Sequence, residues 1–204
     1  MLKRLLLTLG LGLAILIPLA ALAVSSPLDM LQTTSQQMIS ELKTNQSTIK
    51  SDPKRVYSIV NKVLIPHVDR EEMARAVVGR VAWNAATPAD QQEFIKQFTH
   101  MLVNTYAAAL ASYTDQKVVF SPIRGGWENQ QQLEVQSQII QSGGPAIPVS
   151  YHLALENQQW MVTDFSVDNV SIISNFRAQF ASDLQQMGLK GLNTKLAAHN
   201  RAAG

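Results

Sequence analysis

The sequence predicts an α+β fold: a helical N-terminal part packed on a curved antiparallel sheet of about four strands, followed by a C-terminal helix pair. Two observations favour this class. Apolar residues recur at helical spacing before about Ser112 and alternate with polar residues after it. The composition, 46% hydrophobic and 16% charged, is typical of a chain that buries a core, and 204 residues suit one domain.

The first 23 residues have the layout of a secretory signal peptide. Lys3 and Arg4 precede an uncharged, leucine-rich run over residues 5–17, Pro18 breaks that run, and residues 21–23 read Ala-Leu-Ala. An uncleaved anchor is the alternative, which Pro18 and the short apolar run disfavour. We therefore predict a cleaved signal peptide over residues 1–23 and a single domain over residues 24–204.

Removal of the signal peptide changes the charge balance. Two of the 17 cations are lost, so 15 cations remain against 15 acids, and the net charge becomes zero. A neutral chain without a basic block is not typical of a nucleic-acid-binding protein. The chain has no cysteine, which excludes a disulfide scaffold, a thiol nucleophile and a cysteine zinc site. Export without cysteine is consistent with a bacterial periplasm.

Four helices are predicted before the sheet, each beginning at a residue that can cap a helix. Their expected ranges are 26–45, 52–65, 69–78 and 87–112, which together make up a helical part over residues 26–113. Ser26 and Thr87 are each followed by proline at the first helical position. Asp69 has Glu72 three residues later, in the manner of a capping box, and Gly79 ends that helix.

The sheet is expected within residues 116–168, where the period changes to two. Predicted strands cover residues 117–122, 132–141, 147–155 and 159–167, with turns at 142–145 and 156–158. C-terminal helices are expected over residues 171–198, interrupted at Gly188, with a frayed tail from His199. If the helices do not close fully on the apolar face of the sheet, the space between them is an apolar pocket.

Few residues suggest catalysis. The histidines outside the signal peptide are His67, His100, His152 and His199, and none has metal-ligand spacing with another His, Asp or Glu, so we expect no metal and no cofactor. His152 and Asp164 fall on adjacent predicted strands and could pair as a dyad for dehydration or isomerisation. The alternative is that His152 lies on the polar face and Asp164 braces a turn. An ion pair between Arg80 and Asp164 is a further interpretation.

Two sequence blocks resemble the MlaC family, also called toluene-tolerance proteins. Residues 79–85 read Gly-Arg-Val-Ala-Trp-Asn-Ala and precede a run of large apolar residues at family spacing. That run is Phe94, Phe98, Leu102, Tyr106, Leu110 and Tyr113. Residues 160–164 read Trp-Met-Val-Thr-Asp, residues 167–171 read Val-Asp-Asn-Val-Ser, and Asn175-Phe176-Arg177 follows. This chain departs from the family pattern where Asp168-Asn169 replaces Glu-Gly and Phe176 replaces Tyr.

The resemblance implies a periplasmic carrier that holds the acyl chains of a glycerophospholipid in an apolar pocket. It also implies partners: an inner-membrane ABC transporter with an MCE-domain subunit and an outer-membrane lipoprotein–porin complex, docked transiently by a monomer. We take as lipid-binding candidates the inward positions of the long helix, the central strands and the returning helix. They are Phe98, Met101, Leu102, Tyr106, Val149, Tyr151, Leu153, Val162 and Phe176.

Two other functions compete with a carrier. One is an isomerase or dehydratase that uses His152 and Asp164 in a small, partly polar cavity. The other is a non-catalytic periplasmic interaction module with a solid core and an exposed apolar patch. Bound phospholipid favours the carrier, a small polar ligand favours the enzyme, and the absence of both favours the interaction module. Our expectation is that the protein is not an enzyme.

Overall fold

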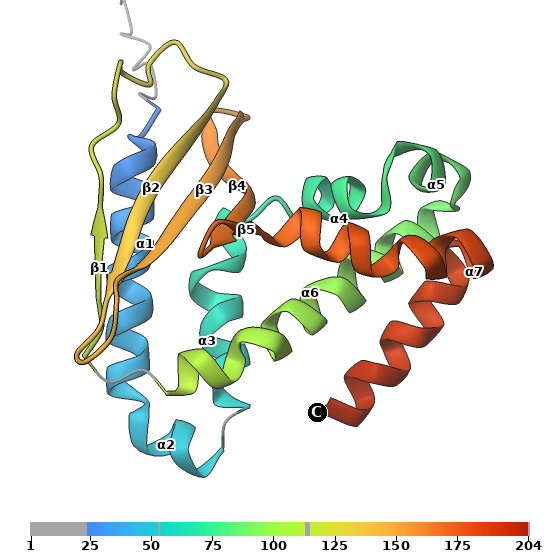
Figure 1. The fold of residues 1–204 in the computed structure, drawn as a ribbon, viewed down its shortest axis with the longest axis horizontal. Coiled ribbons are helices and arrows are strands. Elements are labelled where there is room, and N and C mark those ends of the chain that lie inside the picture. The colour runs from blue at the N-terminus through green and yellow to red at the C-terminus, as the bar shows by residue number, and fades with distance from the viewer. Residues whose placement is uncertain (1–23, 53, 113–114, 204) are drawn as a thin grey trace, which may run out of the picture.

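The computed structural model describes residues 24–52, 54–112 and 115–203, so the predicted signal peptide lies outside the described residues. Helices precede and follow a single sheet (Figure 1). Those before the sheet are α1 (Pro27–Thr44), α2 (Gln46–Ser51), α3 (Arg55–Val63), α4 (Arg70–Val78), α5 (Arg80–Ala85) and α6 (Pro88–Ala111). A 3₁₀ turn, η1 (Ile65–His67), joins α3 to α4, and α7 (Ile172–Ala203) ends the described chain.

Side-chain caps set the starts of three of these helices, as predicted. Ser26, Asp69 and Thr87 each accept a hydrogen bond from a backbone N–H in the first turn of α1, α4 and α6. The expected capping box at α4 is wrong in one half, because the Glu72 carboxylate pairs with Arg75 instead of returning to the Asp69 N–H. The short helices α2 and α5 were not predicted.

The sheet is an antiparallel meander of five strands in the order β1-β2-β3-β4-β5. They are β1 (Lys117–Phe120), β2 (Gln132–Ile140), β3 (Ile147–Glu156), β4 (Gln159–Val167) and β5 (Val170–Ser171). The fifth strand is one more than expected. Asn157 and Gln158 between β3 and β4, and Asp168 and Asn169 between β4 and β5, all have positive φ, as two-residue hairpin turns require. Asparagine tolerates this conformation, so the departure at Asp168-Asn169 preserves the turn.

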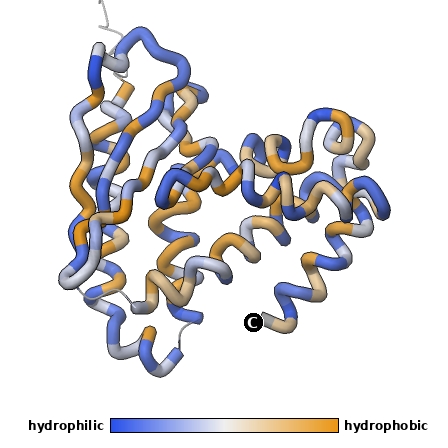
Figure 2. Tube along the Cα trace, viewed as in Figure 1, coloured by the Kyte–Doolittle hydropathy of each residue, from blue (hydrophilic) through white to orange (hydrophobic). Residues whose placement is uncertain are grey.

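Three apolar clusters form the interior. The helical core lies between α4, α5, α6 and α7, the second cluster joins α1, α2 and α3 to Val103 of α6, and the sheet core joins Leu31 of α1 to β2, β3 and β4. In Figure 1 the sheet and α1 form one half of the molecule, and α4, α5 and α7 form the other, with α6 between them. Figure 2 shows hydrophobic and hydrophilic positions alternating along the strands.

The C-terminal helix differs from expectation at its end. Gly188 has φ 65° and ψ −176°, a conformation that is essentially restricted to glycine, and it kinks α7 where a break was predicted. The predicted frayed tail is wrong, because α7 continues to Ala203. Asn200 is 4% exposed, and its amide donates to the Gln97 carbonyl at 2.9 Å, which holds the last turns of α7 against α6.

Candidate ligand-binding site

Three of the predicted lipid-binding residues lie in the helical core. Phe98, Met101 and Phe176 are 2%, 5% and 5% exposed. The rings of Phe98 and Phe176 are 5.4 Å apart between centroids, in an edge-to-face arrangement, and both rings also contact Phe180. Because each of these side chains is enclosed by other helices, they are structural core in this conformation.

Three others belong to the sheet core. Leu153 and Val162 are buried side by side on β3 and β4, and Leu31 of α1 covers them. Tyr151 packs against the same core, and its ring lies 5.9 Å from that of Phe120. Burial raises the pKa of the Tyr151 phenol, and the nearby Ser137 side chain partly offsets that rise. The predicted set is therefore divided between two clusters.

The boundary between the helical core and the sheet core is marked by aromatic side chains. Tyr106 of α6 meets Phe165 of β4 with 6.0 Å between ring centroids. Leu102, one turn earlier on α6, and Tyr106 are both partly buried against the helical core, and burial raises the pKa of the Tyr106 phenol. Val68 packs against both cores and forms a β-bridge with Val162. Residues 102 and 106 thus lie where helices and sheet meet.

Beyond Tyr151, the inner face of the sheet belongs to none of the three clusters. Val149 is 6% exposed, yet it lies outside all of them, and so do its half-buried neighbours on the same face. The register pairs Val149 with Val167 and Ile147 with Ile139. We call these four residues the inner-face patch. This patch lies next to Tyr151 and Phe165 on the same face of the sheet. Its side chains are apolar, and the helices leave them only partly covered.

The sequence missed Phe165 and Val167 on this surface for one identifiable reason. Between His152 and Leu153 the pairing of β3 with β4 shifts, so that Leu153 pairs with Val162 and His152 pairs with Asp164. This bulge inserts Thr163 and reverses the alternation of β4 beyond it. Phe165 and Val167 consequently share the inner face with Val162, whereas uninterrupted alternation from Val162 would have assigned them to the outer face. Alternation in β2 could have identified Ile139.

The His152–Asp164 pair does not form the predicted dyad. The Asp164 carboxylate accepts hydrogen bonds from the Ser171 hydroxyl at 2.6 Å and from the backbone N–H groups of Phe165 and Ile173 at 2.8 and 3.2 Å. Among the described residues, the carboxylate within ion-pair distance of His152 is Glu134, at 3.7 Å. Asp164 therefore braces the turn into α7, which was the alternative interpretation.

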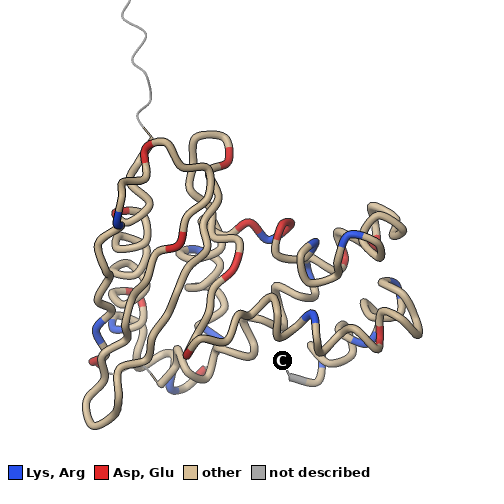
Figure 3. Tube along the Cα trace, turned by 45° about the horizontal axis from the view of Figure 1, so that its top comes forward, with Lys and Arg blue, Asp and Glu red and all other residues tan. Residues whose placement is uncertain are grey.

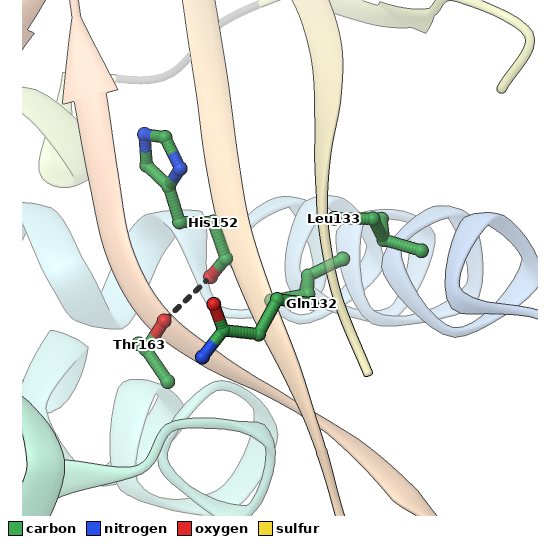
Figure 4. Close-up of a pocket in the computed structure, with 5 residues that line it drawn as sticks. Gln132, Leu133, His152 and Thr163 are labelled. Carbon is green, nitrogen blue, oxygen red and sulfur yellow. Dashed lines mark hydrogen bonds between the residues drawn. The ribbon is translucent and has the colours of Figure 1, made fainter. Parts of the chain in front are cut away.

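Two of the cavities that open on the surface of the described residues both lie away from the inner-face patch. The first, of about 260 Å³, is lined by His152, Thr163 and three neighbours on β2 and β3. In Figure 4 the Thr163 hydroxyl donates to the His152 carbonyl, and the imidazole points away from that bond. The second, of about 370 Å³, lies between α5 and α7 and includes Arg80. The structure gives no ion pair between Arg80 and Asp164 among the described residues, so that interpretation was wrong.

Within residues 24–52, 54–112 and 115–203, no group of three His, Asp or Glu side chains could hold a metal ion. No helix in this part of the chain is both long enough and apolar enough to cross a bilayer. The fold and the site define the class of protein as an α+β protein with an apolar candidate ligand surface on the inner face of an antiparallel sheet.

The chain belongs to the MlaC family, because the family model described as MlaC protein matches residues 32–198. Toluene tolerance protein ttg2D of Pseudomonas putida is 29% identical over 171 residues, covering 84% of this chain and 79% of that protein. The intermembrane phospholipid transport system binding protein MlaC of Haemophilus influenzae is 29% identical over 187 residues, covering 90% of this chain and 86% of that protein.

The fold matches a solved structure. A phospholipid-binding protein from Ralstonia solanacearum, in complex with a phospholipid, superposes with a TM-score of 0.81 at 23% sequence identity. The match covers 88% of this chain and 99% of the Ralstonia chain. It establishes that helices and sheet are arranged as in that protein, and it confirms the α+β class expected from the sequence.

Proposed function

We propose that this protein is a periplasmic phospholipid carrier that binds the acyl chains of a glycerophospholipid against the inner-face patch. The observation that carries the proposal is the patch itself: an apolar surface of Ile139, Ile147, Val149 and Val167 that belongs to no core cluster. Membership of the MlaC family supports the ligand class, as does the phospholipid in the structurally similar Ralstonia protein. Leu102 and Tyr106 would contact the chains from α6.

The energetics of such a cargo favour transfer by docking. A diacyl lipid has roughly 30 methylenes, and each is worth about 0.8 kcal/mol when removed from water. Shelter from water is thus worth on the order of 20 kcal/mol, which forbids release into solution. A bilayer offers nearly the same apolar shelter. The direction of transfer therefore comes from partners or an energised pump, for which we propose the predicted inner-membrane ABC transporter and outer-membrane lipoprotein–porin complex.

Few polar groups lie near this surface, which favours recognition of hydrocarbon over recognition of a head group. On the inner face, the polar side-chain groups are the Tyr151 hydroxyl and the buried Ser137 hydroxyl, which has no hydrogen-bond partner among the described residues, and both stand between apolar neighbours. The remaining inward positions near it are aliphatic or aromatic. We propose that the head group stays outside the sheet and that the protein has no catalytic role. The hydrogen bonds of Asp164 support the absence of a catalytic role, because they use this carboxylate to brace α7.

The test compares a charge on the inner-face patch with the same charge on the outer face. Val167→Glu introduces a carboxylate at a half-buried inner position, and Val119→Glu introduces one on β1 at a residue that is 54% exposed. Each variant is exported from a bacterial host, checked by circular dichroism, and analysed for bound phospholipid by native mass spectrometry. We expect Val167→Glu to lose most of its lipid and Val119→Glu to keep it.

Charges at Leu153 or Met101 would be poorer tests. Both side chains are at most 5% exposed in packed cores. An arginine at either position would therefore destabilise the fold as well as weaken ligand binding. A folded Val167→Glu protein with the same phospholipid content as the parent would contradict the site. Absence of phospholipid from the parent protein itself would contradict the function.

A further inference from the structure

Charge is divided unequally between the two halves of the molecule. Helices α5 and α7 carry five cations and one acid, a surplus of four positive charges. The cations are Arg80, Arg177, Lys190, Lys195 and Arg201. Residues 115–171, which contain the sheet, carry six acids and two cations. Figure 3 shows mostly acidic charges along the strands. A chain that is neutral from residue 24 onward is therefore strongly dipolar.

The positive end also exposes apolar side chains. Val81 on α5 is 84% exposed, the highest value among the large hydrophobic residues that the structure describes as exposed, and Met187 on α7 is 44% exposed. Between the two helices lies the groove of about 370 Å³, open to solvent and lined mainly by apolar side chains. Those lining residues include Val78, Ala82, Ala85 and Leu184.

Arg80 stands at the edge of this groove without an acidic partner among the described residues. Two other cations of this half are paired: Lys195 with Asp183 at 2.7 Å, and Arg75 with Glu72. The guanidinium of Arg177 donates to the Ala76 carbonyl, next to the start of the groove, and keeps its full charge. An exposed valine beside an unpaired arginine therefore marks the tip of the positive half.

We propose that the tip formed by α5 and the adjoining part of α7 docks on a membrane surface that contains anionic phospholipid. Cations attract anionic head groups, while exposed apolar side chains enter the boundary between head groups and acyl chains. A lipid surface fits better than an acidic protein, because the groove is open to solvent and Val81, which lines it, is 84% exposed. Because the chain as a whole is neutral from residue 24 onward, the contact is weak and reversible, and the negative sheet half faces away from the membrane.

Vesicle binding tests this surface without any reference to bound cargo. The probes are vesicles of phosphatidylcholine alone and vesicles with one third phosphatidylglycerol, sedimented with the exported protein. We expect binding to the anionic vesicles only. Raising the salt from about 0.1 M to about 1 M shortens the Debye length from about 10 Å to about 3 Å and should release the protein.

Two variants and two matched controls locate the contact. Arg80→Glu should weaken binding to anionic vesicles about 30-fold, since it removes one attraction and adds one repulsion, and Arg80→Gln about fivefold. Val81→Glu should weaken it comparably. The controls are Arg124→Glu and Val119→Glu, which place the same changes at exposed positions of the sheet half. Both should bind as the parent does.

Three results would overturn the proposal: no binding to anionic vesicles, equal binding to both vesicle types, or equal loss in the tip variants and their controls. The first would leave the tip available for an acidic protein surface instead. Phospholipid content, measured on the same preparations, reports separately on the proposed carrier function. Because Arg80 and Val81 lie outside the inner-face patch, their variants should keep the lipid content of the parent.

Discussion

Removal of the Asp164 carboxylate should lower the free energy of unfolding substantially. It should not remove a catalytic group, because we propose that Asp164 braces α7 and that the protein has no catalytic role. This side chain accepts three hydrogen bonds, from the Ser171 hydroxyl and from the backbone N–H groups of Phe165 and Ile173. Ser171 in turn accepts from the Ser174 N–H at 3.0 Å, so the first turn of α7 depends on this arrangement. A lost cap costs about 1 kcal/mol, and bonds to a charged acceptor are worth about 1.5–3 kcal/mol each.

We therefore expect Asp164→Ala to lower the free energy of unfolding by about 3 kcal/mol, since water can reach this half-buried site and replace part of the loss. Urea denaturation followed by circular dichroism measures it. Asp164→Asn keeps one acceptor oxygen and should lose about half as much.

His152→Ala is the matched control for this prediction. His152 is exposed on the outer face and pairs only loosely with Glu134 at 3.7 Å, so its removal should change stability by less than about 0.5 kcal/mol. A loss under about 0.5 kcal/mol in Asp164→Ala would refute the bracing role. Equal losses in both variants would restore the idea that the two residues act as a pair.

Three further predictions concern packing and titration. Gly188→Ala should lower stability by about 1–3 kcal/mol, seen as a lower melting temperature, because the kink of α7 has φ 65° and ψ −176°. Asn200→Ala should cost about 1–2 kcal/mol and speed hydrogen exchange in the last turns of α7, where the amide donates to Gln97. Burial raises the pKa of the Tyr151 phenol above its unfolded value of about 10. The contribution of this phenol to the stability of the folded state is therefore complete below about pH 10, and it is lost as the pH rises through the folded pKa. Tyr151→Phe should therefore flatten the fall in stability between about pH 9 and about pH 11, measured by urea denaturation.

Local signals in the sequence located most elements. Proline after Ser26 and Thr87 marks the starts of α1 and α6, and alternation marks the long strands within one or two residues. The short elements α2, α5 and β5 were missed. Helices of six residues and a strand of two residues are too short for a periodic pattern of apolar residues to be detected. The end of α7 was missed because its order comes from Asn200 and Gln97, which are far apart in sequence.

The sequence constrains the candidate site less than it constrains the fold. Helical periodicity shows that Phe98, Met101 and Phe176 face inward, but not whether the interior there is closed. The structure encloses them among helices, and it leaves the inner-face patch only partly covered. Composition cannot distinguish these cases, since a filled core and a ligand surface use the same residue types.

Sequence alone determined the α+β class and the positions of the long helices and strands, because these depend on patterns among neighbouring residues. It also determined the neutrality of the chain after residue 23, because this depends only on the number of charged residues. Tertiary structure decided the rest. The bulge between β3 and β4 set which residues of β4 face inward and turned Asp164 towards α7. The packing of α5 against α7 gathered Val81 and Arg80 beside Leu184, more than a hundred residues later in the chain. Both depend on pairings between distant segments, which no local pattern records.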